Sequence, residues 1–207
     1  MTNIAIIGTG RMAQGLGAGW VRAGHRVVFG SRNPAEKSGL VSEIGNGASV
    51  TLPAAAVAWA DVVVLAIPFA QVKTFAREHA PQLAGKLVVD ISNPFDQLPD
   101  NRIAGAELTA AAIGDGARVV AAFKDNFWET LPTPEDPGGL PRDVHFAGDS
   151  DDDRQRVAQL VTDLGFRPVD CGPLKNARAL DAMVPLLVEL DQRLNNGQHS
   201  SSWKFLR

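Results

Sequence analysis

The glycines that follow the first apolar run could bind a phosphate-bearing nucleotide. Residues 8–13 read Gly-Thr-Gly-Arg-Met-Ala, and they follow the predicted strand at residues 4–8. In such a turn the first glycine permits a tight bend, the second lets the backbone approach a pyrophosphate, and a small last residue allows close packing. The free N–H groups of the next helix then face the phosphates. A ligand-free turn is the alternative, but strand, turn and helix together favour a dinucleotide site at Gly8, Thr9, Gly10, Arg11 and Met12.

The residues after the second strand decide which dinucleotide fits. NAD-binding proteins usually place an acid about 20 residues after the glycine turn, where it binds a ribose hydroxyl. This chain has Gly30-Ser31-Arg32 at that place, and its first following acid is Glu36. A serine hydroxyl and a guanidinium suit a 2′-phosphate, and Lys37 offers a further cation. We therefore predict NADP(H) as the cofactor, with an ordinary solvated arginine as the alternative.

Two further strand ends are expected to face the same cleft. They carry the strings Ile67-Pro68-Phe69 and Ser92-Asn93-Pro94. Ligands of open α/β sheets bind beyond the carboxyl ends of the strands. We therefore expect the nicotinamide pocket to be lined by Ile67, Pro68, Asn93 and Pro94. Prolines that only end strands would give the same pattern.

A parallel sheet is needed to bring these segments together, and the chain has the pattern of one. Residues 61–67 read DVVVLAI, as expected of a strand covered on both faces. The expected strands are residues 4–8, 26–30, 49–51, 61–67, 86–91, 118–123, 144–147 and 167–171. The expected helices are 11–23, a brief one opening at Pro53, 69–79, 106–113, 151–164 and 175–194. This alternation predicts an α/β, Rossmann-type, doubly wound and mostly parallel sheet.

The second half of the chain is expected to complete the fold. We predict a dinucleotide-binding Rossmann domain at residues 1–125 and a small C-terminal α/β extension at 126–207 that closes the substrate pocket. Residues 126–143 carry four prolines and no useful period, which indicates a long and functional loop. The helix at 175–194 has one apolar stripe, with Pro185 expected to kink it. That stripe exceeds what one contact with the sheet needs, so we predict a homodimer.

Composition argues against several classes of protein. The 207 residues are 45% hydrophobic and 21% charged, which is typical of a globular chain. A net charge of −3 without a clustered basic face argues against a nucleic-acid partner. The apolar runs are too short for a membrane helix. The strand pattern starts at Asn3 and leaves no room for a signal peptide, and Cys171 is the single cysteine. We therefore expect a cytoplasmic protein.

The other titratable residues give no sign of a catalytic or metal site. The four histidines share no metal-ligand spacing, so we predict no metal and interpret each as a surface or packing residue. The acidic run at residues 149–153 lacks the spaced ligands of a calcium loop, and we expect it to begin a helix instead. Cys171 has no activating neighbour in the sequence and is expected to be a packed thiol.

With these motifs in place, the chain resembles the family of deazaflavin (coenzyme F420)-dependent NADP oxidoreductases. Over most of the chain the resemblance is carried by the strings IIGTGRMAQGLG, VVFGSRN, VVVLAIPF, DCGPLKNARALDAMVPLL and a closing KFL. It implies a Rossmann domain with a small C-terminal part that helps to close the pocket, commonly in a dimer. It also implies NADP contacts at Thr9, Gly10, Arg11, Met12, Ser31 and Arg32, with Lys37 one residue out of register.

The resemblance further implies hydride transfer between NADPH and a deazaflavin, a small-molecule redox coenzyme. Such a transfer requires two aligned rings and the exclusion of water, and little side-chain chemistry. We expect Phe69 to form part of the ring slot, and Ser201, in the closing segment, to border the same pocket. The basic rim for the coenzyme's tail is expected to come from Lys124, Arg142, Lys175, Arg178 and Lys204.

The chain departs from the family pattern where the acceptor would dock. Ala121-Ala122-Phe123-Lys124 stands where related sequences often have Lys-Ala-Phe-Asn or Leu-His, and the proline-rich loop follows. Other acceptors therefore stay open: a flavin, a ferric chelate, or a carbonyl or imine with Lys124 as proton donor. A non-enzymatic redox sensor that binds NADPH is the remaining alternative.

Overall fold

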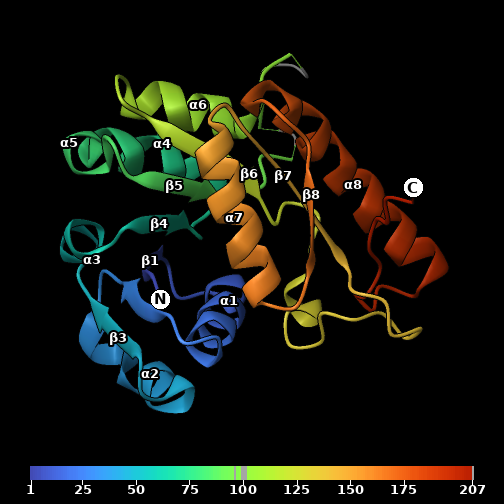
Figure 1. The fold of residues 1–207 in the computed structure, drawn as a ribbon, viewed down its shortest axis with the longest axis horizontal. Helices are drawn as coiled ribbons and strands as arrows, with labels where there is room; N and C mark the ends of the chain where they lie inside the picture. Colours follow the sequence, from blue (N-terminus) through green and yellow to red (C-terminus); the bar gives the residue numbers. More distant parts are fainter. Residues whose placement is uncertain (96, 99–101, 207) are drawn as a thin grey trace.

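Eight strands form one sheet through the centre of the molecule (Figure 1). The computed structural model describes residues 1–95, 97–98 and 102–206. The strands are β1 Asn3–Ile7, β2 Arg26–Gly30, β3 Ala48–Thr51, β4 Val62–Leu65, β5 Leu87–Asp90, β6 Arg118–Ala122, β7 Asp143–Gly148 and β8 Arg167–Asp170. Their order is β3-β2-β1-β4-β5-β6-β7-β8, and among these described strands only the β6–β7 pair is antiparallel. The predicted doubly wound, mostly parallel α/β fold is confirmed.

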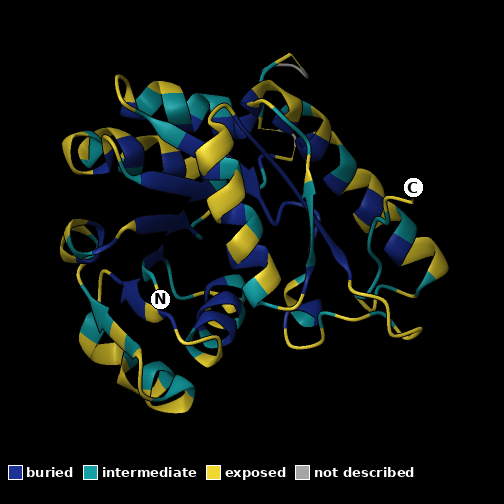
Figure 2. Cartoon of the chain, in the orientation of Figure 1, coloured by how far each residue is buried: buried dark blue, intermediate teal, exposed yellow. Residues whose placement is uncertain are grey.

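Helices cover both faces of the sheet. One face packs against α1 Arg11–Arg22, α2 Ser38–Ile44 and α7 Asp151–Asp163. The other packs against α3 Pro53–Trp59, α4 Phe69–Glu78, α5 Ala80–Leu83, α6 Gly105–Ile113 and α8 Ala177–Leu194. Because both faces are covered, the central strands are buried along their whole length, as the dark strands of Figure 2 show.

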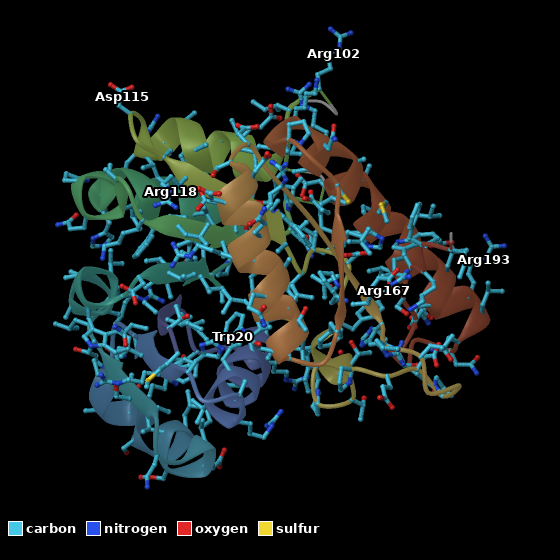
Figure 3. The ribbon with its side chains drawn as sticks, viewed as in Figure 1. Trp20, Arg102, Asp115, Arg118, Arg167 and Arg193 are labelled. Carbon is cyan, nitrogen blue, oxygen red and sulfur yellow. The ribbon has the colours of Figure 1, made fainter. Side chains whose placement is uncertain are left out.

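A tryptophan ties the helices of the first face together. The Trp20 indole N–H of α1 donates to the Leu160 carbonyl oxygen of α7 at 3.0 Å. Its ring meets Phe123 edge-on, with 6.2 Å between the ring centroids. Trp20 lies between the two helices in Figure 3. This contact fixes α1, whose first turn forms part of the site described below, against the rest of the core.

The acidic run at the start of α7 is structural, as the sequence predicts. The Ser150 hydroxyl oxygen accepts a hydrogen bond from the Asp153 backbone N–H at 3.3 Å and caps the helix. The buried Asp153 carboxylate pairs with Arg118 of β6, which lies beside α7 in Figure 3. Hydrogen bonding to Asp153 raises the pKa of Arg118, so the guanidinium is charged throughout the physiological range.

Some elements differ from the sequence prediction. Helix α2 was not predicted, because it is only seven residues long and none of its residues is buried, which leaves a weak apolar period. The short helix α5 was also missed. The loop 126–143 contains the 3₁₀ helix η2 Trp128–Thr130 and a bridge between Glu135 and Pro141. The predicted helix 175–194 begins as the 3₁₀ helix η3 Leu174–Asn176 and continues as α8.

The last two strands extend the same sheet. Strand β7 pairs with β6, and β8 pairs with β7. The division at residue 125 stays a prediction, as does the homodimer. On α8, Leu180, Val184 and Leu187 are buried, whereas Leu186 and Leu194 are exposed. Among the described residues, no helix is both long and apolar enough to cross a bilayer.

Candidate functional site

The two glycines of the first turn have different reasons to be glycine. Gly8 has a φ of +118°, and a Cβ built there would lie 2.3 Å from the Ala66 carbonyl oxygen. Packing within the protein therefore requires Gly8. A Cβ at Gly10 would meet no described atom within 4 Å. Gly10 therefore borders open space, which is the property that the approach of a pyrophosphate requires.

Helix α1 begins without the side chains that normally pair with the first backbone N–H groups of a helix. Gly10 supplies no side-chain cap, and the first turn of α1 holds no acid. Helix α7, by contrast, begins with a serine cap and three aspartates. The unpaired N–H groups and the positive end of the α1 dipole therefore stay available for an external anion.

A cleft of about 720 Å³ opens beside this turn, at the carboxyl edge of the sheet. It is bordered by the ends of β1 and β2 on one side and by α4 on the other. The predicted site residues that line it are Gly8, Thr9, Gly10, Ser31, Arg32, Lys37, Ile67 and Pro68. One cleft thus brings together the glycine turn, the serine-arginine pair and the end of β4, and their contact with a nucleotide stays a prediction.

The end of the cleft beside β2 is polar and holds two cations. The buried Ser31 hydroxyl oxygen accepts a hydrogen bond from the Asn33 N–H at 3.2 Å. Arg32 is exposed and makes no ion pair with a described residue. The 3₁₀ helix η1 Pro34–Lys37 brings Lys37 to the same wall, together with Glu36, which sequence reasoning left outside the site. Two cations against one carboxylate leave this end net positive, as a 2′-phosphate requires.

One face of α4 forms a wall that sequence reasoning missed. Gln71, Thr74, Phe75 and Glu78 all line the cleft. Their spacing of three, four and seven residues places them on one side of a helix, so a search for mixed polar and aromatic residues at this period would have found them. An aromatic ring and polar groups on one wall suit a nucleobase, which offers a flat face and a polar edge.

Arg11, Met12, Phe69 and Pro94 are among the predicted site residues that do not line this cleft. The Arg11 guanidinium lies over the Trp128 ring, 4.5 Å from its centroid, and Met12 packs against the core. Phe69 and Pro94 both pack on Gly105, because a Cβ built on that glycine would lie 2.9 Å from the Phe69 ring and 3.5 Å from Pro94. Phe69 therefore packs against Gly105, whereas we expected it to form a wall of an open slot.

A second cavity, of about 110 Å³, lies at the carboxyl ends of β5 and β6 and is covered by α8. Asn93 and Phe127 line it, with Val184 and Leu187 of α8 opposite. The Asn93 amide nitrogen donates to the Lys124 carbonyl oxygen at 2.9 Å. Phe95 and Phe123, on the two loops that form this cavity, have φ values of 47° and 54°. Such strained backbone is often found at functional sites.

Lys124 occupies a different place from the rim position that the sequence indicated. Its side chain is fully buried, and the ammonium donates to the Ser92 carbonyl oxygen. The Lys124 Nζ lies 3.1 Å from Asp181 Oδ1 and 3.9 Å from Asp90 Oδ1. These carboxylates hold the charge inside the protein, so the ammonium cannot form a basic rim in this conformation. The family-based expectation of a rim cation here therefore does not match the geometry.

The tail after α8 is held by a buried carboxylate. Asp191 accepts hydrogen bonds from the backbone N–H groups of His199, Ser200 and Ser201 at 2.8, 3.2 and 3.0 Å. Burial alone would raise the pKa of Asp191, but hydrogen bonds from the side chains of Ser201 and Asn195, together with the backbone bonds from His199 and Ser201, hold it well below its usual range. Ser201 therefore lies at the anchor and not in either cavity. The His199 ring stacks on Phe127, with 5.1 Å between centroids, so the tail reaches the second cavity through Phe127.

Replacing Asp191 by Asn should loosen this tail. One acceptor oxygen becomes an NH₂ group that faces backbone N–H donors, and each donor left unpaired costs about 1–3 kcal/mol. We expect a loss of about 2–4 kcal/mol in the free energy of unfolding at neutral pH, measured by urea titration. Because the folded pKa is depressed, the Asp191 contribution is present above the unfolded pKa and is lost as the pH falls towards the folded value. Equal stability of the variant and the wild type at every pH would show that Asp191 does not hold the tail.

Sequence and fold comparisons place the chain among known proteins. A family model of coenzyme F420-dependent NADP oxidoreductases matches residues 3–94. The F420-dependent NADP reductase of Methanothermobacter thermautotrophicus is 32% identical over 210 residues, which span 92% of this chain and 89% of that relative. The chain belongs to this family of NADP oxidoreductases.

This oxidoreductase is also similar to a metalloreductase and to a solved structure. It is 34% identical over 185 residues to metalloreductase STEAP3 of Rattus norvegicus, a match that spans 88% of the chain but 36% of that relative. The oxidoreductase therefore spans about a third of the length of STEAP3. A crystal structure of a candidate F420-dependent NADP reductase from Arthrobacter sp. FB24 superimposes over all of both chains, with a TM-score of 0.89 and 25% identity.

Proposed function

We propose that the protein transfers a hydride between NADPH and a deazaflavin of the coenzyme F420 type. The observation that carries the proposal is the pairing of two spaces at one sheet edge. The larger cleft has an uncapped helix start and two cations, and the smaller cavity lies beyond the next two strands and is largely apolar. The family match to F420-dependent NADP reductases supports the choice of acceptor.

The residues of the larger cleft fit NADPH. The open space at Gly10 and the free N–H groups of α1 would receive the pyrophosphate, and Ser31 with Arg32 would hold the 2′-phosphate. Ile67 and Pro68, at the end of β4, would lie along the route to the nicotinamide. Bound here, NADPH would supply the hydride from its nicotinamide ring.

The second cavity supplies orientation and the exclusion of water. Phe127, Val184 and Leu187 give it apolar walls, and α8 covers it. A cavity of about 110 Å³ is large enough for the reacting edge of a ring, so most of the acceptor would lie outside it. Apolar walls around the reacting edge align two rings and remove competing water, which is the main requirement of hydride transfer.

A panel of acceptors tests the proposal. NADPH oxidation would be followed by stopped flow, without oxygen, against the deazaflavin, FMN, FAD and a ferric chelate. We expect fast oxidation with the deazaflavin and little with the other acceptors, because the family match favours the deazaflavin over flavins and a ferric chelate brings no flat ring to align. Fast turnover with FMN or the ferric chelate, and none with the deazaflavin, would overturn the proposed acceptor. It would not bear on the proposed NADPH site.

Metal reduction is the second candidate, and one observation favours it. The likeness to STEAP3, named a metalloreductase, covers 88% of this chain. The ferric chelate in the same panel tests this candidate directly. If the protein reduces the ferric chelate only when flavin is added, that result would favour metal reduction over deazaflavin reduction.

A further inference from the structure

A buried carboxylate at the second cavity has one oxygen without a hydrogen-bond partner among the described residues. Asp125 follows β6, is 3% exposed and lines the cavity. Its Oδ2 lies 2.8 Å from Nδ1 of His145 on β7, and His145 is 6% exposed. Its Oδ1 is buried and has no hydrogen-bond partner among the described residues. A buried carboxylate oxygen without a partner is costly, and the cost indicates a group that binds there.

The neighbouring polar groups show what kind of group fits. Asn93 Oδ1 and Asn126 Oδ1 are also buried without partners among the described residues, and both asparagines line the cavity. Their amide nitrogens donate to the carbonyl oxygens of Lys124 and Asp143, each at 2.9 Å, which fixes the orientation of both amides. The two amide oxygens are therefore acceptors, and they suit a ligand that brings N–H or O–H hydrogens. The free Asp125 oxygen accepts when the carboxyl group is ionised and donates when it carries a proton.

We propose that Asp125, oriented by His145, exchanges a proton with the hydride acceptor at the second cavity. The proposal rests on the proposed hydride transfer, since a two-electron reduction of a ring or carbonyl requires one proton as well. It gives the reaction the acid–base group that the sequence did not reveal. Asp125 is the catalytic residue in this assignment, because its free oxygen would touch the acceptor, and His145 is a positioning residue.

The step balances with one proton held by the pair. Before transfer the pair is either a carboxylic acid beside a neutral imidazole or a carboxylate beside an imidazolium. The nicotinamide C4–H bond breaks and a C–H bond forms on the acceptor, which moves two electrons. The Asp125 O–H bond then breaks, and its proton passes to the acceptor's ring nitrogen or carbonyl oxygen. Asp125 is left as a carboxylate that accepts a hydrogen bond from the neutral His145 Nδ1–H, and a solvent proton restores the pair.

The charges around the pair set its pH range. Burial alone would lower the pKa of His145, but the hydrogen bond and charge of Asp125 outweigh burial and raise it. The charge of Asp143 also raises this pKa, and Arg167 lowers it. The charged or titratable groups on the segments packed around β7 include Asp143, Arg167, Asp170, Cys171, Lys124, Asp181 and Asp191. His145 therefore keeps its proton to a higher pH than an ordinary histidine does, and loses it as the pH rises further.

Asp125→Asn tests the proposal, because it keeps the shape of the side chain and removes the proton. We expect kcat for deazaflavin reduction to fall about a hundredfold, the lower end for a lost acid–base group. The wild-type kcat should decline with rising pH, and this decline should disappear in Asp125→Asn. His145→Gln should move the decline to lower pH, and Asp125→Glu should recover part of the rate. NADPH affinity, measured by fluorescence without an acceptor, should be unchanged.

A second readout does not depend on turnover. Adding oxidised deazaflavin without NADPH should shift the His145 titration midpoint, followed by histidine NMR, in the wild type and not in Asp125→Asn. Asp163→Asn is the matched control, since it breaks a similar pair, His25 with Asp163 at 2.9 Å, at the opposite edge of the sheet. We expect this control to keep the wild-type kcat and pH profile.

The outcomes separate this proposal from the proposed function. If the wild type reduces deazaflavin and Asp125→Asn keeps its rate and pH profile, the proton assignment fails while hydride transfer stands. If the wild type reduces only a ferric chelate, the assignment also fails, because one-electron reduction needs no proton on the acceptor. If the wild type reduces none of the panel, nor a carbonyl or imine, both the proton assignment and the proposed function are wrong.

Discussion

Replacing Gly10 by valine is expected to abolish NADPH binding while the chain stays folded. A side chain at this position would meet no described protein atom within 4 Å, so the fold has room for it. The same space is where the pyrophosphate must approach the first turn of α1, and a branched side chain would fill it. We expect NADPH affinity to fall by at least about a thousandfold, or about 4 kcal/mol, as measured by fluorescence titration.

The control for this variant is Gly39→Val. Gly39 lies on α2 and is exposed, and a Cβ built there would also meet no described atom within 4 Å, but Gly39 does not line the cleft. We expect this control to bind NADPH like the wild type. A folded Gly10→Val protein that still binds NADPH would show that the dinucleotide lies elsewhere.

Reversing the charge at Arg32 should remove the preference for NADPH over NADH. The loss of a charge-assisted hydrogen bond costs about 1.5–3 kcal/mol, and the repulsion between a new carboxylate and the 2′-phosphate adds to that cost. We expect Arg32→Asp to weaken NADPH binding by about two to three powers of ten and to leave NADH little changed. Titration of both nucleotides against both proteins measures the effect.

Arg156→Asp is the matched charge reversal. Arg156 is exposed on α7 and does not line the cleft. Its reversal changes the net charge equally, so any long-range effect of charge would appear in both variants and weaken at high salt. Equal affinity of the wild type for NADH and NADPH would contradict the assignment of Ser31 and Arg32.

The nucleotide half of the site could be read from the sequence because its chemistry lies on short contiguous strings. The glycine turn and the serine-arginine pair each follow a strand, and parallel strands bring such ends to one edge. The central strands were also predictable, since β4 is apolar throughout and covered on both faces. Where the strands end differs from the prediction by a residue or two, as at Phe123, whose left-handed backbone follows the end of β6.

The acceptor half could not be read in this way, because its parts are far apart in the chain. Asp125 and His145 are twenty residues apart and meet only because β7 runs antiparallel beside β6. The sequence presents Lys124 as an available cation, but Asp181, 57 residues later, holds it inside. The direction of the Lys124 side chain depends on how α8 packs over the sheet, and no local sequence pattern predicts that packing.

The uncapped start of α1 also bears on local stability in the absence of a nucleotide. Four backbone N–H groups open any helix without an internal partner, and here no side chain replaces the missing cap. The first turn of α1 should therefore fray more readily than that of α7, and its amide hydrogens should exchange faster with solvent. A bound pyrophosphate would act as the cap. Slowed amide exchange at residues 11–13 is thus a direct local signature of an occupied cleft, separate from any change in global stability.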